Sequence, residues 1–253
     1  MKKIHYLGLF FIIVFIGFVS GPTQVFAGEL NFTVTSIFPE NQQNNALGYF
    51  DLRMKPNQKQ SIEVELTNTS DQAITVDMYA TTAVTNLNGV IEYKDLEPTL
   101  DTSLTYPFQT VAELPESVDL KGNETKNVTI DLTMPETEYN GMILGGLYFK
   151  EQGKEEAELS DQQGMGVRNV FSYVVGVKLT ETDVALQPDL KLLEARGGQV
   201  NYHNAFEAQL QNPEAVEMND LTVTAQVMKQ GSSTILYEET REGLRMAPNS
   251  NFY

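Results

Sequence analysis

The chain has 253 residues, with no cysteine, no tryptophan, two histidines, and 17 basic against 34 acidic side chains. The lack of cysteine excludes disulfides, thiolate zinc sites, iron–sulfur clusters and a cysteine nucleophile. The net charge of −17 argues against binding to nucleic acid and against electrostatic adhesion to anionic membranes. Hydrophobic residues make up 41% of the chain and charged residues 20%, a composition that can bury a core and is not that of a disordered protein.

The N-terminal residues predict export. Lys2 and Lys3 precede an almost unbroken apolar run over residues 4–19, which is shorter than the ~20 residues that a membrane-spanning helix needs. Val25 and Ala27 supply the small residues of a cleavage site, so residues 1–27 are predicted to be a signal peptide that is cleaved after Ala27. An uncleaved N-terminal anchor is the alternative. Loss of the two lysines would lower the net charge from −17 to −19, with His203 as the one histidine left.

Residues 28–150 are predicted to form an immunoglobulin-like β-sandwich. Apolar and polar residues alternate with a period of two over residues 61–67, 73–80 and 128–134, which is typical of strands buried on one face. Turn-forming pairs such as Asn88-Gly89 and Asn140-Gly141 separate these runs. The residues expected to point into the core are Ile62, Val64, Leu66, Ile74, Val76, Met78, Val128, Ile130, Leu132 and Met134.

A charged segment follows, and then a second and shorter domain. Residues 151–166 are rich in glutamate and glycine and are predicted to be a linker or a long surface loop. Alternation resumes in residues 167–253, at residues 171–179, 202–210 and 221–227, so this part is predicted to be a second immunoglobulin-like domain. Roughly five strands are expected here, where a sandwich usually has about seven. We therefore expect the second domain to be incomplete and the C-terminus to be truncated.

No enzyme signature is present. The sequence has no G-x-S-x-G, Walker, H-E-x-x-H or calcium-loop motif, and no cofactor or metal site is predicted. Gly145-Gly146 lies in an apolar run and is expected to mark a strand that a neighbouring backbone approaches closely. Glu92 and Asp95 are the least implausible pair of catalytic carboxylates for a carbohydrate-active enzyme, although solvated hairpin residues explain them better. His203 is expected to be exposed on a strand.

Amide and aromatic side chains in turns are the better candidates for a binding function. Such residues suit sugars and peptides, because rings stack on apolar sugar faces and amides hydrogen-bond to hydroxyl and acetamido groups. The alternative for each is ordinary turn chemistry, with asparagine and glycine in tight turns and aromatic rings anchoring loops to the core. Residues 106–108 form a further aromatic stretch, and the ligand-binding candidates are Asn86, Asn88, Tyr93, Tyr139 and Asn140.

Several segments together resemble one known family. The segments are Gly48–Leu52, Pro56–Gln60, Leu66–Ser70, Ala83–Tyr93, Met134-Pro135, Gly141–Gly146, Leu210–Pro213 and Met246–Phe252. In this order and spacing they are similar to the WxL-interacting proteins of Gram-positive bacteria, long catalogued as a pair of domains of unknown function. The likeness covers nearly the whole chain after residue 27.

The resemblance implies a non-catalytic protein of the cell wall and cell surface. Its first domain would bind peptidoglycan, its second would bind host extracellular proteins, and secreted WxL-domain proteins would be partners. The family normally ends in a transmembrane anchor, and this sequence departs from that pattern by ending at Tyr253. A purely structural stalk or assembly subunit is the alternative function, and a carbohydrate-active enzyme is a more distant one. Because wall polymers are anionic, binding by a chain of net charge −19 after loss of the leader would have to rest on short-range contacts.

Overall fold

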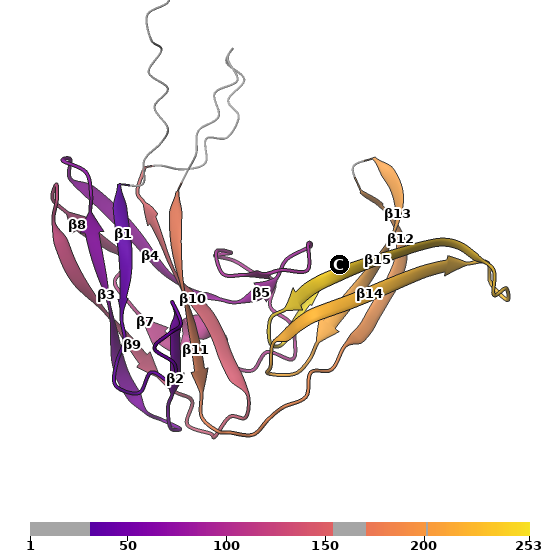
Figure 1. The fold of residues 1–253 in the computed structure, drawn as a ribbon, viewed down its shortest axis with the longest axis horizontal. Coiled ribbons are helices and arrows are strands. Elements are labelled where there is room, and N and C mark those ends of the chain that lie inside the picture. Colours follow the sequence, from indigo (N-terminus) through magenta and orange to yellow (C-terminus); the bar gives the residue numbers. More distant parts are fainter. Residues whose placement is uncertain (1–30, 154–170, 201) are drawn as a thin grey trace, which may run out of the picture.

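A computed structural model of the chain describes residues 31–153, 171–200 and 202–253. The described residues form sixteen β-strands and one short 3-10 helix, η1 (Phe108–Thr110), and contain no α-helix. The strands lie in two units that Figure 1 shows side by side. The predicted all-β, sandwich-like architecture is therefore confirmed, while the predicted signal peptide and most of the predicted linker lie outside the described residues.

The first unit is a sandwich of two sheets. One sheet has the order β1-β3-β9-β7 and the other has the order β2-β11-β10-β4-β8. All neighbouring strands in both sheets are antiparallel except β2 and β11, which are parallel. The first sheet consists of β1 (Phe32–Ile37), β3 (Lys59–Asn68), β9 (Thr125–Thr133) and β7 (Ala112–Glu113). The second consists of β2 (Phe50–Arg53), β11 (Ser172–Thr180), β10 (Met142–Glu151), β4 (Ile74–Thr82) and β8 (Ser117–Leu120).

The core of the first unit lies between these sheets, and its composition follows from the alternation in the sequence. Each apolar residue that the period of two places on the inner face is at most 8% exposed, whereas its polar neighbours point outward. The ten residues predicted to point into the core are all buried in one cluster. The side of each strand was thus predictable from the sequence, because one face of each strand is hydrophobic and the other is not.

Strand β11 lies in a different unit from the one predicted. We expected residues 171–179 to open the second domain, but β11 pairs with β10 from Met142↔Thr180 to Lys150↔Ser172. On its other side it pairs with β2, from Val177↔Phe50 to Thr180↔Arg53. This pairing could not be predicted from the sequence, because alternation identifies a half-buried strand and carries no information about which sheet receives it.

The glycine pair Gly145-Gly146 lies in the middle of β10. A methyl group at Gly145 would overlap the ring of Phe108, which is fully buried in the core. At Gly146 a methyl group would lie 3.0 Å from Cβ of Tyr93. A close approach was predicted here and is found, but side chains approach the glycines rather than the backbone of a neighbour.

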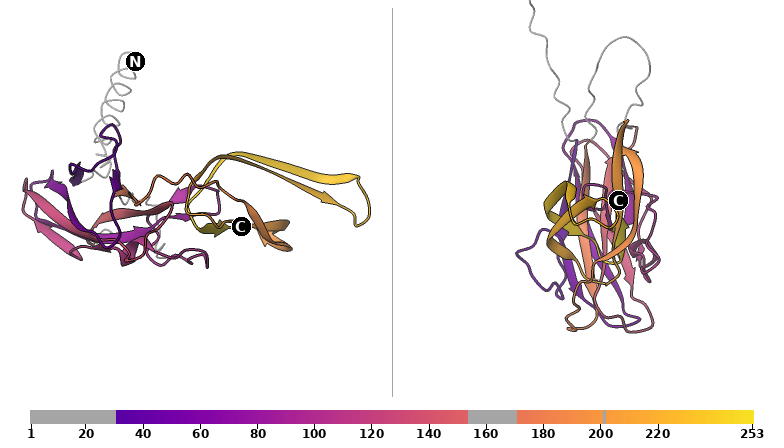
Figure 2. Two further views of the ribbon diagram at one scale, coloured as in Figure 1. Left: turned by 90° about the horizontal axis from the view of Figure 1, so that it is seen from below. Right: turned by 90° about the vertical axis from the view of Figure 1, so that its right-hand side faces the viewer.

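The second unit has a three-stranded sheet and a separate two-stranded ribbon. The sheet has the order β12-β13-β16, with β12 (Lys191–Val200), β13 (His203–Asn212) and β16 (Ser250–Phe252). The ribbon pairs β14 (Met218–Met228) with β15 (Ile235–Met246) and extends away from the first sandwich (Figures 1 and 2). The core of the second unit has five buried residues, Leu210, Met218, Leu244, Met246 and Phe252. His203 is exposed on β13, as predicted.

Candidate functional site

The hairpin β5 (Val84–Thr85)–β6 (Ile91–Glu92) carries the first group of predicted binding residues. The side-chain oxygen of Asn86 accepts hydrogen bonds from the backbone N–H of Asn88 at 2.9 Å and of Val90 at 3.2 Å. Gly89 adopts a φ of 68°, and its carbonyl accepts a hydrogen bond of 2.8 Å from the N–H of Arg245. Asn86 therefore shapes the turn, and the turn docks on the second unit, whereas Asn88 is exposed.

Tyr93 lies where the two units meet. It packs against a small cluster of buried residues from both units, which includes Leu144 and Ala247. Burial, followed by the nearby carboxylate of Glu217, raises the pKa of Tyr93 to about 12. The ring thus serves as an apolar contact in the joint between the units.

Tyr139 and Asn140 lie at the same joint, near the start of β10. The hydroxyl of Tyr139 donates to the side-chain oxygen of Asn249 at 3.3 Å, and its ring meets Tyr106 edge to face at 5.2 Å between centroids. Burial, followed by Tyr106, raises the pKa of Tyr139 to about 12. Asn140 is exposed and accepts a hydrogen bond of 2.7 Å from the hydroxyl of Thr182. Three of the five predicted residues (Asn86, Tyr93 and Tyr139) are thus engaged in the turn or the joint, and a role in ligand binding stays a prediction for all five.

Asp101 is a buried joint residue that the sequence reasoning missed. Its carboxylate accepts hydrogen bonds from the side-chain amide of Gln211 at 2.8 and 3.0 Å and from that of Asn251 at 2.5 Å. The N–H of Ser103 donates a further bond of 2.8 Å. Burial alone would raise the pKa of Asp101, but the hydrogen bonds from Ser103, Asn251 and Gln211 together outweigh it, so this pKa is lowered. Isolated polar residues in a long loop give no periodic signal that could have revealed this contact.

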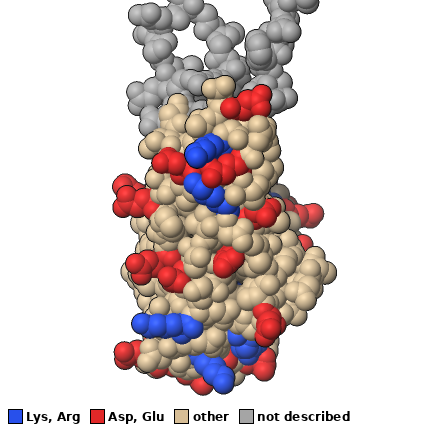
Figure 3. Space-filling view, turned by 90° about the vertical axis from the view of Figure 1, so that its left-hand side faces the viewer, with Lys and Arg blue, Asp and Glu red and all other residues tan. Residues whose placement is uncertain are grey.

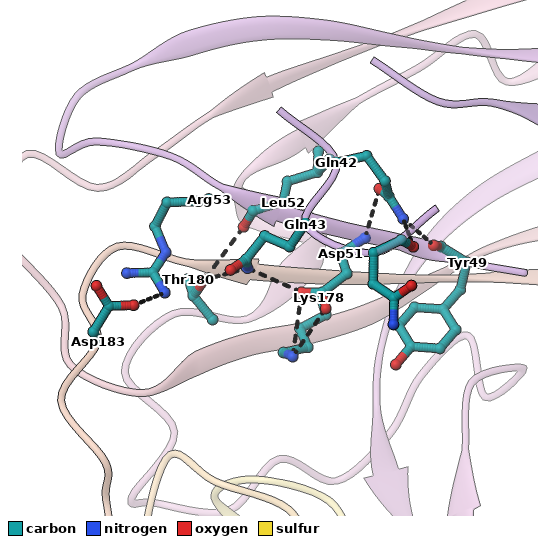
Figure 4. A network of polar contacts seen from close by, with 10 residues as sticks. Gln42, Gln43, Tyr49, Asp51, Leu52, Arg53, Lys178, Thr180 and Asp183 are labelled. Carbon is teal, nitrogen blue, oxygen red and sulfur yellow. Dashed lines mark hydrogen bonds and ion pairs between the residues drawn. The ribbon is translucent and has the colours of Figure 1, made fainter. Parts of the chain in front are cut away.

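A second polar network fixes the segment before β2 against β11 (Figure 4). The side-chain amide of Gln43 donates to Asp51 and to the hydroxyl of Thr180, at 3.2 Å each. Lys178 pairs with Asp51 at 3.2 Å, and the N–H of Asp51 donates to the side-chain oxygen of Gln42 at 3.0 Å. These groups are satisfied within the protein, so we assign the network to stabilising the parallel β2–β11 pair.

The carboxylates of Glu92 and Asp95 are engaged with different neighbours. Glu92 accepts a hydrogen bond of 3.3 Å from the side-chain amide of Asn86 and lies 3.8 Å from the ammonium of Lys94. Asp95 is exposed and accepts a hydrogen bond of 3.1 Å from the N–H of Glu97. In the described part of the chain, no recorded contact joins the two carboxylates.

The outer face of the β4–β10 pair presents aromatic side chains that the sequence reasoning also missed. Tyr79 and Tyr148 are directly opposite each other in the register, and their ring centroids are 6.0 Å apart with the planes tilted by 35°. The ammonium of Lys150 lies 5.4 Å from the ring centroid of Tyr79. Alternation could have shown that each tyrosine points outward, because Tyr79 follows the inward-facing Met78 and Tyr148 precedes the buried Phe149.

The charges on the surface are mixed in sign where they can be seen. Figure 3 shows the end of the first sandwich that faces away from the second unit, where basic side chains lie between acidic ones. Within residues 31–153, 171–200 and 202–253, no group of three or more acidic or histidine side chains is arranged to hold a metal ion. The same residues include no helix that is long and apolar enough to cross a membrane.

The fold is that of an all-β protein of two units with sandwich-like sheets. Residues 32–151 match the family model of the WxL Interacting Protein peptidoglycan-binding domain, and residues 162–253 match that of the WxL Interacting Protein host-binding domain. The chain therefore belongs to the WxL-interacting protein family, whose domains are binding domains and which is associated with the cell surface and cell wall. The predicted resemblance is confirmed.

Solved structures with similar folds are distant in sequence. One is a complex of the CsuC chaperone and the CsuE tip subunit from Acinetobacter baumannii, with 13% identity, a TM-score of 0.40, and coverage of 88% of this chain and 86% of that chain. Another is the class 5 fimbriae chaperone CfaA, with 9% identity, a TM-score of 0.36, and coverage of 88% and 84%. A family 123 glycoside hydrolase from Clostridium perfringens has 12% identity, a TM-score of 0.33, and coverage of 63% and 28%. No curated protein matches the chain.

Proposed function

We propose that the chain is a non-catalytic protein of the Gram-positive cell wall that holds peptidoglycan through its first domain. WxL-domain surface proteins are its partners, and the second domain contacts host extracellular proteins. The chain reaches the cell surface by means of a signal peptide that is cleaved after Ala27. The observation that carries this proposal is the match of residues 32–151 to a peptidoglycan-binding domain.

The paired tyrosines of β4 and β10 supply a surface suited to glycan. Tyr79 and Tyr148 are half-buried, so each exposes part of an aromatic ring on the outer face of the sheet. Such rings stack on the apolar faces of sugars, a short-range contact that an excess of negative charge does not prevent. We propose this surface as a glycan contact.

The test is sedimentation of the purified chain, without residues 1–27, with insoluble peptidoglycan. We expect retention at both low and high salt, because stacking depends little on ionic strength. Replacing Tyr79 and Tyr148 together with alanine should weaken retention about tenfold, equivalent to about 1.4 kcal/mol. The control Tyr237→Ala removes an exposed tyrosine from the second unit and should bind as the unaltered chain does.

Two results would contradict the proposal. If the unaltered chain stays in the supernatant at every salt concentration, the protein is an assembly subunit rather than a wall-binding one. If reducing ends are released from wall glycan and Glu92→Gln abolishes their release, the protein is an enzyme.

A further inference from the structure

A groove runs along one side of the first sandwich, outside the joint. It has a volume of about 500 Å³ and lies between the second half of β4 on one side and η1 and β7 on the other. Tyr79 and Ala80 contribute from β4, and Ala112 and Glu113 from β7. The volume is sufficient for a short peptide or a disaccharide.

The β4 side of the groove is an unpaired strand edge. Strand β8 covers β4 only from Ile74 to Asp77, and the last bond on that side runs from the N–H of Met78 to the carbonyl of Glu116. Backbone groups alternate in direction along an antiparallel strand, so Ala80 points its N–H and carbonyl the same way as Met78. Those groups face the groove, and no hydrogen bond recorded in the described residues engages them.

The β7 side of the groove is also an unpaired strand edge, but a shorter one. The N–H of Thr133 donates to the carbonyl of Val111, so the residues of this segment that bond to β9 are Val111 and Glu113. Ala112, between them, directs its N–H and carbonyl away from β9 and towards the groove. The residue with free backbone groups is Ala80 on the β4 side of the groove and Ala112 on the β7 side. Their small side chains leave room for another chain.

The charged residues that line the groove are all acidic. They are Glu113, Glu116 and Asp131, and neither lysine nor arginine is among the lining residues. No ion pair is recorded for these three carboxylates within the described parts of the chain. A bound group that complements this lining would be positively charged and would offer amide N–H and carbonyl groups to the strand edges.

We propose that this groove binds the peptide moiety of peptidoglycan, with a free ammonium group of that peptide facing Glu113 and Glu116. The inference rests on the proposed function and adds the part of the wall that is recognised. The acidic lining of the groove favours this proposal, because carboxylates attract the ammonium group of a wall peptide. The adjoining Tyr79 lines the groove and also belongs to the proposed glycan contact, so glycan and peptide would bind side by side.

The experiment compares three wall preparations with the chain lacking residues 1–27. These are intact peptidoglycan, peptidoglycan with its free amines acetylated, and glycan freed of peptide by an amidase. We expect binding about tenfold weaker to the second and third preparations than to the first. The double variant Glu113→Gln/Glu116→Gln should bind intact peptidoglycan as weakly as the unaltered chain binds the acetylated form. The control Glu63→Gln/Glu65→Gln makes the same charge change on β3, away from the groove, and should leave binding unchanged.

A soluble probe locates the contact. The tetrapeptide L-Ala-D-isoglutaminyl-L-Lys-D-Ala should shift the amide NMR signals of Ala80 and Ala112, and its Nε-acetyl analogue should shift them less. Equal binding to all three wall preparations would overturn this inference and leave the proposed function standing, whereas no binding to any of them would overturn both. Tighter binding of the all-L peptide acetyl-Lys-Thr-Val-Lys-Thr-amide than of the tetrapeptide would overturn it in favour of a protein segment.

Discussion

At the residue scale, the same side chains that suggested a ligand site serve the joint between the units. Asn86 forms the turn of a hairpin, while Tyr93 and Tyr139 are half-buried against residues of the second unit. Asparagine and tyrosine suit turns and packing as well as ligands, so the sequence predicted that these positions matter without indicating what they contact. The outward direction of Tyr79 and of Tyr148 could have been predicted from alternation, but not that the two rings lie side by side.

Asp101 should control how firmly the second unit is held. Asp101→Ala leaves the buried amide of Gln211 and the half-buried amide of Asn251 without their acceptor, so we expect a loss of about 1–3 kcal/mol in the free energy of unfolding. Urea unfolding measures this loss, with the exposed Asp95→Ala as the matched control. A loss no greater than that of the control would show that the amides find other partners.

The pH dependence at Asp101 follows from its lowered pKa. The folded protein releases this proton more readily than the unfolded chain, whose carboxyl has the ordinary value of 3.8. The stabilisation is therefore fully present above the ordinary pKa and is lost as the pH falls through the lower, folded value. The difference in stability between the unaltered chain and Asp101→Ala should shrink over that acidic range.

Gly145 should tolerate no side chain. Gly145→Ala places a methyl group in the space of the buried Phe108 ring, and overpacking of this kind costs about 1–3 kcal/mol. The control is Gly197→Ala, because nothing lies within 4 Å of the position that a methyl group would take at Gly197. Thermal unfolding of both variants checks the prediction, and equal melting temperatures would contradict it.

At the element scale, the strands were predictable and their partners were not. The period of two identified β3, β4 and β9 with their buried faces, because each strand has one apolar face. The sheet that receives a strand depends on contacts made far along the chain, which local alternation does not encode. Strand β11 shows this, since its neighbour β2 lies more than a hundred residues earlier in the sequence.

The position of β11 predicts the smallest part of the first unit that folds. A fragment of residues 28–151 lacks a strand from the interior of the sheet and exposes the edges of β2 and β10, so we expect it to aggregate. A fragment of residues 28–183 retains β11 and the Arg53–Asp183 ion pair of 2.6 Å, so we expect it to unfold cooperatively. Circular dichroism and size-exclusion chromatography of the two fragments test this. Cooperative unfolding of the shorter fragment would mean that β11 is dispensable.

At the scale of the whole molecule, the two units differ greatly in buried apolar surface. The first unit has 24 buried residues in its core cluster and the second has five. Large apolar side chains on the strands of the second unit remain in water, including Phe206 at 74% exposure and Leu236 at 69%. Contacts with the first unit, such as the hydrogen bond of 2.6 Å between Thr85 and Ser250, therefore contribute much of what holds the second unit in place.

The second unit, with its smaller buried core, should be locally less stable than the first. Because the β14–β15 ribbon has few buried contacts, we expect its amide hydrogens to exchange at least about tenfold faster than those of β3, β9 and β10. Hydrogen exchange followed by mass spectrometry measures both sets in one sample, so each serves as the reference for the other. Equal protection of the ribbon and the sandwich would refute the expectation.

The parallel pairing of β2 with β11 also sets an order of events during synthesis. The chain grows from its N-terminus, so residues 50–53 are made long before residues 177–180, with which they pair. Until then the sheet has a gap between β2 and β10, and closing it requires a loop of well over a hundred residues, which slows folding. The first unit thus completes its fold only after synthesis has passed residue 180, which makes its folding late relative to the place of its first strands in the sequence.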